Sequence, residues 1–251
     1  MTFPAKYARI LILLLLMAAW EIAGRRTSRV LLTPLSEVGR TLFDILTLQA
    51  LPDFYLNVWI TLQAVLASFA LATIAGLVVG FLLGTWRRGG DAFSPLIAAL
   101  WAVPSVIFYP VMLGLLGLGV PSKVGLAFAT SFPLVVLGTM SAVRGIDAQF
   151  IRVAQAYGAG PRQLFLKVMA PAAAATLAGT LRLAFSICVI MVLVGELLAG
   201  GAGLGHMLDS ASKFFRTSQY FAIVLFTLAF AFALNLLAGF AERRVRAWTR
   251  Q

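Results

Sequence analysis

The sequence predicts an all-α integral membrane protein with about six transmembrane helices. Hydrophobic residues make up 61% of the 251 residues, charged residues only 12%, and the mean hydropathy is +0.95. Soluble domains carry roughly 25% charged residues, and the basic residues here stand mostly at the ends of long apolar runs. This pattern is typical of several spans in one membrane domain.

The composition also excludes several functions. The formal net charge of +11 does not indicate nucleic-acid binding, because the basic residues form no stretch interleaved with aromatic residues. Cys188 is the only cysteine and His206 the only histidine, which excludes an internal disulfide and a His/Cys metal cluster. No Gly-Lys dipeptide occurs, so the chain lacks a Walker A loop. We expect this chain to bind no cofactor.

Residues 1–56 are predicted to form an N-terminal transmembrane helix and an exterior segment. The apolar run Ile10–Ala23 follows two basic residues, which is also the outline of a signal peptide. A tryptophan and a glutamate stand where a cleavage site needs small residues, and this favours an uncleaved span. Ser36–Leu48 is predicted to be a short amphipathic helix outside the membrane.

Residues 57–251 are predicted to be the transmembrane core, which begins with a span at Thr61–Trp86. That length suffices to cross a hydrocarbon core of about 30 Å. Gly76, Gly80 and Gly84 recur at every fourth position and leave one face of this helix without side chains. Such a face allows close helix packing. We expect it to pack within the chain; a seam between two copies is the alternative.

The next apolar stretch, Ser94–Gly119, is interrupted by Pro104 and Pro110. Proline removes a backbone hydrogen bond, so a helix here should kink. Broken helices persist in membranes where they are buried in protein or line a cavity. Both prolines are therefore candidates for lining a transport pathway. Further spans are predicted at Val124–Val143 and Tyr220–Phe240.

The remaining span, Pro171–Ala199, contains two charged residues, Arg182 and Glu196. Charges inside spans are rare and usually face a bundle interior or a cavity. At a rise of 1.5 Å per residue the two lie roughly 20 Å apart and cannot pair within the helix. They are candidates for the pathway, with snorkelling and interface placement as the alternatives. Gly200–Gly205 is predicted to be a flexible exterior loop.

The polar loop 144–171 is nevertheless predicted to be helical. The apolar residues of its first helix fall at i, i+3, i+4 and i+7, namely Phe150, Val153, Ala154 and Tyr157. Gly158 should end this helix, and Pro161 suits the first turn of a second one. Leu164 and Phe165 form the apolar side of the second helix, and Pro171 is expected to limit its continuation.

An apolar stripe on a protruding helix pair fits the groove of a partner. The alternative is that these helices lie flat on membrane lipid headgroups.

This loop resembles the Glu-Ala-Ala loop of the permease subunits of bacterial ABC importers, best in the branch for nitrate, sulfonates and taurine. The motif glycine corresponds to Gly158, the proline to Pro171 and the second alanine to Ala154. Arg152 stands in place of the glutamate and Val153 in place of the first alanine. The charge reversal keeps the docking shape and leaves the usual electrostatic contact open.

The resemblance runs roughly from Asn57 to the C-terminus and implies the fold of a type I ABC importer permease. In that family the loop docks onto a separate ATPase subunit, which uses the ATP. The assembly has two ATPase copies, an extracytoplasmic solute-binding protein and a second permease copy, here expected to make a homodimer. The coupling residues implied are Phe150, Val153, Ala154, Tyr157, Gly158, Leu164, Phe165 and Pro171.

The resemblance further implies alternating access for a small organic or inorganic anion, with a vitamin precursor as the alternative. Six spans with both ends inside place more of the 20 lysines and arginines inside than outside, as the positive-inside rule requires. The loop 144–171 then faces the cytoplasm, and we expect a multi-pass protein of the bacterial cytoplasmic (inner) membrane. A secondary transporter or channel and a membrane scaffold are the other classes. Secondary transporters often show internal repeats, which the sequence lacks.

Overall fold

The computed structural model describes residues 5–248, with side chains from residue 10 to residue 246 except residue 175. Over this range the secondary structure is helical, without strands. The helices are α1 (Ala5–Arg26), α2 (Leu35–Leu46), α3 (Phe54–Thr85), α4 (Arg87–Ala102), the 3₁₀ helix η1 (Ser105–Phe108), α5 (Tyr109–Leu116), α6 (Val120–Arg144), α7 (Ala148–Ala156), α8 (Pro161–Leu164), the π-helix η2 (Phe165–Met169), α9 (Ala170–Ala199), α10 (Leu204–Lys213) and α11 (Thr217–Trp248).

The described helices account for most of the predicted spans. Four are long and apolar enough to cross a membrane, at Phe54–Thr85, Val120–Arg144, Thr176–Ala199 and Thr217–Arg246. A fifth candidate consists of α4 followed by the segment Ser105–Leu116, which contains η1 and α5. The two parts are bent by 81° against each other and count as one span if they form a single broken helix. The predicted first span lies in α1, and part of that helix has side chains outside the described range. Its crossing of the membrane stays a prediction.

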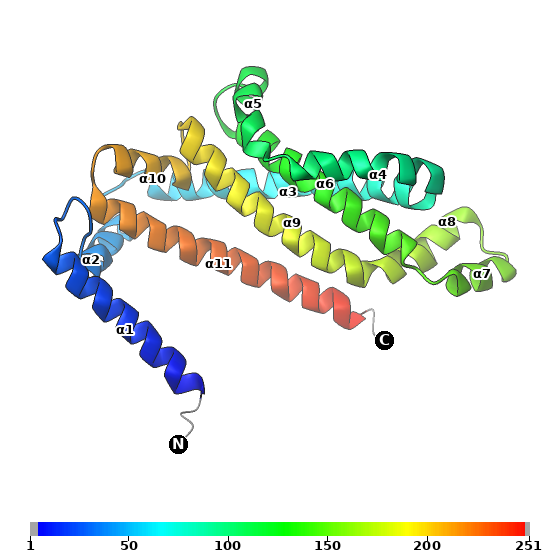
Figure 1. The fold of residues 1–251 in the computed structure, drawn as a ribbon, viewed down its shortest axis with the longest axis horizontal. Coiled ribbons are helices and arrows are strands. Elements are labelled where there is room, and N and C mark those ends of the chain that lie inside the picture. The colour runs from blue at the N-terminus through cyan, green and yellow to red at the C-terminus, as the bar shows by residue number, and fades with distance from the viewer. Residues whose placement is uncertain (1–4, 249–251) are drawn as a thin grey trace.

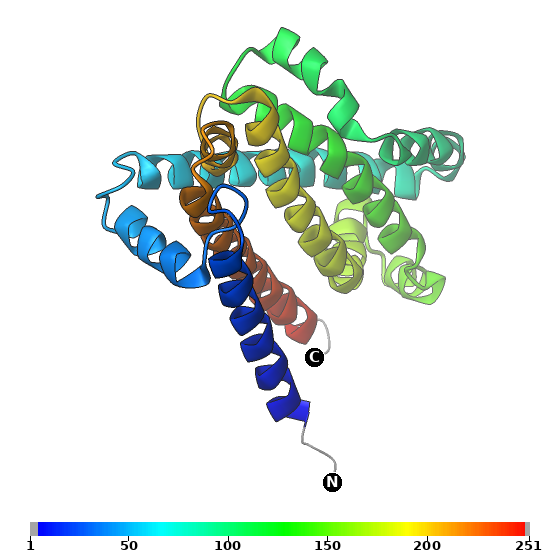
Figure 2. The same cartoon turned by 60° about the vertical axis from the view of Figure 1, so that its left-hand side comes forward.

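The core of the bundle is formed by α3, α6 and α9, with α11 lying along α9 (Figures 1 and 2). The glycine face of α3 packs against α6. A β-carbon added to Gly80 would lie 2.5 Å from the Thr139 Cβ, and one added to Gly76 would lie 2.6 Å from the Val135 Cβ. These distances leave no room for a side chain. The prediction that this face packs within the chain is confirmed.

The two ends of the bundle differ. At one end, called here the loop end, lie α7, α8 and the last turns of α11 (Figure 1). The opposite end, called here the turn end, contains α2, α10 and the turn 200–203 that joins α9 to α10. There Val38 and Ile45 of α2 pack with Phe54, Leu204 and Ile223 in a fully buried cluster. This confirms the short amphipathic helix predicted at 36–48.

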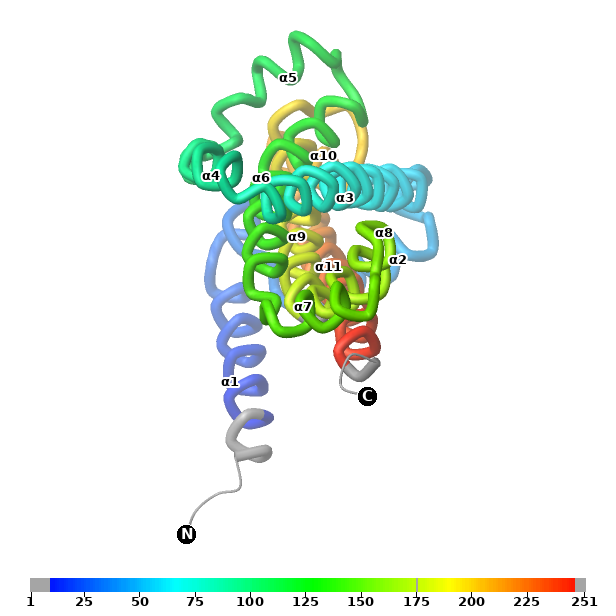
Figure 3. The backbone as a smooth tube through the Cα atoms, turned by 90° about the vertical axis from the view of Figure 1, so that its right-hand side faces the viewer, coloured from blue at the N-terminus to red at the C-terminus, as the bar shows by residue number. Residues whose placement is uncertain are grey.

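Helix α1 leaves the turn end and runs away from the bundle (Figure 3). It is attached near its C-terminal end, where the Trp20 Nε1 atom donates a hydrogen bond to the Thr33 carbonyl at 3.1 Å and the Trp20 ring meets the Phe221 ring edge-on. From Ile10 to Met17 its side chains are exposed and apolar. The membrane is the environment in which such a surface is stable.

Two boundaries differ from the sequence-based expectation. The predicted loop Gly200–Gly205 is shorter, because Leu204 and Gly205 already belong to α10. Pro171 does not limit the helix before it, since it lies in the first turn of α9. The π-helix η2 explains this: the Ala170 N–H donates to the Phe165 carbonyl, five residues back. A wider π turn lets the chain remain helical up to a proline that lacks its own N–H.

Candidate functional site

The loop 144–171 forms the predicted helix-turn-helix. Asp147 caps α7 by accepting a hydrogen bond from the Gln149 N–H at 2.8 Å. Gly158 follows the helix with φ +77°, a conformation that favours glycine. Pro161 is in the first turn of α8. The two boundaries predicted from Gly158 and Pro161 are confirmed, and the cap by Asp147 adds a third that the sequence analysis did not predict.

The apolar face of α7 is uncovered in this chain. The exposed fraction is 62% for Phe150, 49% for Val153 and 89% for Tyr157, which is the residue that ends the helix. Ala154 is half-buried. No residue of α7 is buried. An aromatic surface of this kind at the tip of a protruding motif (Figure 1) is suited to contact a partner.

The second helix of the motif connects the loop to the bundle instead. Leu164 is half-buried, and the Phe165 ring lies edge-on to the Phe81 ring of α3, with 5.0 Å between centroids. Phe165 therefore contacts α3 within the chain. Helices α8, η2 and α9 follow one another without a break, so the loop is joined to α9 through the chain and to α3 through Phe165.

The break predicted in the third span lies at Pro104. Helix α4 ends at Ala102, and the chain turns by 81° into η1 and α5. Pro110 does not interrupt a helix; it sits in the first turn of α5. The Tyr109 hydroxyl, on a buried side chain, donates to the Gly195 carbonyl of α9 at 2.8 Å. The short helix α5 is thereby attached to α9.

Glu196 lies at the turn end and is fully buried. The Thr61 hydroxyl donates to its carboxylate at 2.9 Å, and the Gly205 N–H of α10 donates to it at 2.9 Å. The positive end of the α10 helix favours a negative charge at this place. The carboxylate thus ties α9, α3 and α10 together, and we call these residues with Asn57, Lys123 and Gly203 the Glu196 cluster.

The other members of the cluster hold the turn 200–203. The Asn57 Oδ1 atom accepts a hydrogen bond from the Gly203 N–H at 2.6 Å, and the buried Lys123 ammonium donates to the Ala202 carbonyl. Gly203 has φ +109°, and a β-carbon on it would lie 2.0 Å from the Glu196 Oε1 atom. Glycine is required there on both grounds.

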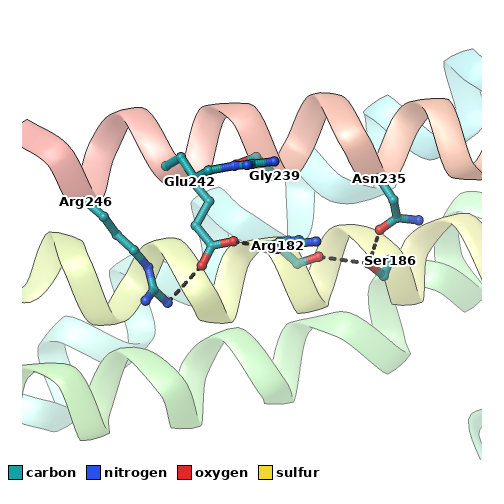
Figure 4. A network of polar contacts seen from close by, with 7 residues as sticks. Arg182, Ser186, Asn235, Gly239, Glu242 and Arg246 are labelled. Carbon is teal, nitrogen blue, oxygen red and sulfur yellow. Dashed lines mark hydrogen bonds and ion pairs between the residues drawn. The ribbon is translucent and has the colours of Figure 1, made fainter. Parts of the chain in front are cut away.

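Arg182 is at the loop end, remote from Glu196 along α9. Its Nη1 atom lies 2.9 Å from the Glu242 carboxylate on α11, which also pairs with Arg246 at 2.8 Å (Figure 4). One turn further along, the Ser186 hydroxyl donates to the Asn235 side chain at 2.5 Å. Together these contacts join α9 to α11. A pathway role for Arg182, Glu196, Pro104 and Pro110 stays a prediction.

The partners of the two charged residues in α9, Arg182 and Glu196, were not predicted from the sequence. Thr61 and Asn57 fall at i and i−4 near the start of a span, which places them on one face. Two polar side chains facing the same way in an apolar helix could have indicated a buried acceptor. Lys123 is buried and Glu242 is half-buried because distant helices pack over them, which no local signal in the sequence indicates.

Comparison with known proteins identifies the fold and family. The model of the family described as "Binding-protein-dependent transport system inner membrane component" matches residues 72–247. A riboflavin transport system permease protein of Chloroflexus aurantiacus is 35% identical over 159 residues, which cover 63% of this chain and 59% of that protein. The taurine transport system permease protein of Escherichia coli is 29% identical over 239 residues, covering 93% of this chain and 86% of that protein.

The structure is also similar to a solved one. An inward-facing structure of the MetNI methionine ABC transporter contains a chain with a TM-score of 0.67 and 19% identity, covering 78% of this chain and 98% of that chain. This supports the predicted type I importer fold. The all-helical bundle, the helical loop with an uncovered apolar face and the match over residues 72–247 agree. The chain belongs to the family of binding-protein-dependent transport inner membrane components, the permease subunits of ABC importers.

Proposed function

We propose that this permease subunit imports a small organic or inorganic anion of the taurine, sulfonate or nitrate kind across a bacterial cytoplasmic membrane. The loop end would face the cytoplasm and carry two ATPase subunits, one on each copy of a permease homodimer. An extracytoplasmic solute-binding protein would deliver the solute at the turn end. The relative from Escherichia coli, named for taurine transport and aligned over 93% of this chain, supports the solute class.

The observation that carries the coupling proposal is the uncovered aromatic face of α7. Phe150 and Tyr157 project apolar surface at the tip of the loop end, where the environment is polar. A groove on the ATPase that covers this face would bury it. Because α8 and η2 lead straight into α9, the covered face would transmit a movement of the ATPase pair to the transmembrane bundle. Alternating access would follow from that movement.

Membership of the family also bears on the two alternative classes, a secondary transporter or channel and a membrane scaffold. A permease of this kind is a transport subunit and not an enzyme. A secondary transporter needs no partner-binding helix pair, and a scaffold needs no broken third span such as the one at Pro104. The combination of both features in one chain favours an ATP-driven importer.

The test is a binding and ATPase assay on the chain in detergent with its cognate ATPase subunit. Wild type is compared with Gly158→Pro and Tyr157→Asp in the loop, and with Leu118→Asp at the connection between α5 and α6. Leu118 is 79% exposed, comparable to Tyr157 at 89%. We expect both loop variants to lose binding and stimulated ATP hydrolysis while the control keeps them. Equal binding by all four proteins contradicts the coupling role.

A vitamin-type solute is the second candidate, supported by the 35% identity to the riboflavin permease. The two candidates separate in a transport assay with the complete importer in proteoliposomes. Taurine, nitrate and riboflavin are each offered with the cognate binding protein present. Uptake of riboflavin alone contradicts the anion proposal and leaves the coupling proposal intact, because the ATPase assay does not depend on the solute.

A further inference from the structure

We propose that a groove between α3, α9 and α11 binds an anionic phospholipid at the loop end. The acyl chain would lie in the groove, and arginines at its rim would hold the phosphate headgroup. This site is separate from the coupling face and from the Glu196 cluster.

The groove itself is apolar and open to the side of the bundle. It has a volume of about 350 Å³, and its lining includes Phe69 of α3, Arg182 and Phe185 of α9, and Leu237, Glu242 and Val245 of α11. Along α11 the lining extends from residue 234 to residue 245, roughly 16 Å at 1.5 Å per residue. That is about half of a 30 Å hydrocarbon core, the depth of one leaflet.

The rim of the groove is positively charged. Arg182 lines the groove and pairs with Glu242, which also pairs with Arg246 (Figure 4). A β-carbon added to Gly179 would lie 3.0 Å from the Arg246 Nη2 atom, so this guanidinium crosses from α11 onto α9. An adjacent depression shares Ala241 and Val245 with the groove and adds Arg244. Two arginines thus pair with a single glutamate, and Arg244 lies in the neighbouring depression.

This charge distribution selects the occupant. Glu242 is shared by Arg182 and Arg246, so two guanidinium groups meet one carboxylate, and a phosphate suits this site because the guanidinium fork is well shaped for it. Arginine side chains at the end of a span place their charge at headgroup level while their stems cover apolar surface. A lipid supplies the two required parts, a chain for the groove and an anion for the rim. A zwitterionic lipid supplies the chain without a net negative charge.

The test measures lipid retention on the full chain in detergent by native mass spectrometry. The probes are phosphatidylglycerol and phosphatidylcholine with identical acyl chains, and inorganic phosphate is offered alone and as a competitor. We expect the wild type to prefer phosphatidylglycerol, by about fivefold for each arginine that contacts the headgroup. Inorganic phosphate should not compete at equal concentration, because it lacks the chain.

Two variants that break the same ion pair should act in opposite directions. Arg182→Gln should reduce the preference for phosphatidylglycerol about fivefold, and Glu242→Gln should increase it, because the rim loses a positive charge in one and a negative charge in the other. A merely structural ion pair predicts the same direction for both. Arg216→Gln, at the turn end, is the control and should change nothing.

The groove is tested separately by filling it. Leu237→Trp should reduce the retention of both lipids, whereas Leu228→Trp should not. Both leucines are on α11 and are equally exposed, at 65% and 66%, but only Leu237 lines the groove. Equal retention of the two lipids by the wild type overturns the headgroup assignment. If Leu237→Trp leaves lipid binding intact but alters the oligomeric state, a second copy of the chain occupies the groove and the proposal is wrong.

Discussion

Truncation of Phe150 to alanine should weaken binding of the ATPase subunit by about 30-fold. A phenylalanine side chain buries roughly 200 Å² when it is fully covered, and 62% of Phe150 is exposed in this chain. Covering that surface would remove roughly 125 Å² from water, which contributes about 3 kcal/mol at 25 cal/mol per Å². The alanine retains part of it, so the expected loss is about 2 kcal/mol, or about 30-fold in Kd.

The measurement is a titration of the ATPase subunit against the permease reconstituted in nanodiscs, followed by a fluorescence or interferometric signal. Phe150→Ala is compared with Leu118→Ala, which removes a large apolar side chain that is 79% exposed and lies outside the loop. Thermal unfolding of both variants is recorded as well. Phe150 is not buried in α7, so its truncation should leave the melting temperature unchanged.

Binding of Phe150→Ala with the wild-type Kd, or an equal loss of affinity in Leu118→Ala, would contradict the role of the α7 face. In the first case the aromatic face is not covered by the ATPase, and the loop acts through another surface. In the second, exposed apolar residues in general, and not the face of α7, determine the affinity. A fall in melting temperature for Phe150→Ala alone would assign the effect to folding.

Three further perturbations probe the bundle, each by thermal unfolding in detergent. Gly80→Ala should lower stability by about 1–3 kcal/mol, since the added Cβ lies 2.5 Å from the Thr139 Cβ. The control Gly39→Ala, with nothing within 4 Å of the new atom, should instead stabilise α2 by about 1 kcal/mol. Equal changes in the melting temperature of the two variants would contradict the packing of the glycine face. Glu196→Ala should cost about 3 kcal/mol because the Gly205 N–H and Thr61 lose a buried charged acceptor; a loss below about 1 kcal/mol would mean that the cluster does not hold the turn end. Gly158→Ala should cost about 1 kcal/mol, because φ is +77° there, whereas Gly160→Ala, at a φ of −70° with no neighbour within 4 Å, should cost less.

The sequence was sufficient wherever a local signal decides the structure. Glycine spacing predicted the α3 face, and Gly158 with Pro161 predicted the two helices of the loop. The break at Pro104 was predicted from the missing N–H of proline. Each of these features depends on a few adjacent residues and their backbone preferences, so an isolated stretch of sequence contains the information.

The partners of the two charges in α9 could not be predicted in the same way. Glu196 meets Thr61 across 135 positions of sequence and Arg182 meets Glu242 across 60. Both pairs depend on the register between helices that are packed by apolar side chains with no directional preference. Pro171 was misjudged for a different reason. The π turn before it is a rare local solution that no proline rule anticipates.

The contacts of α9 restrict how the bundle can move. Helix α9 has 30 residues and is roughly 45 Å long, with the loop at one end and Glu196 at the other. A tilt of α9 against α3 or α10 would break the buried bonds of Glu196 to Thr61 and Gly205, so these three helices should move as one body. Helix α5 is carried along by the bond from Tyr109 to Gly195, whereas α4 is held to α6 by the Arg144–Asp91 pair at 2.8 Å. Because α6 itself packs against the glycine face of α3, both attachments lead to the same body. We therefore expect changes of shape within the bundle during transport to require opening of the Glu196 cluster.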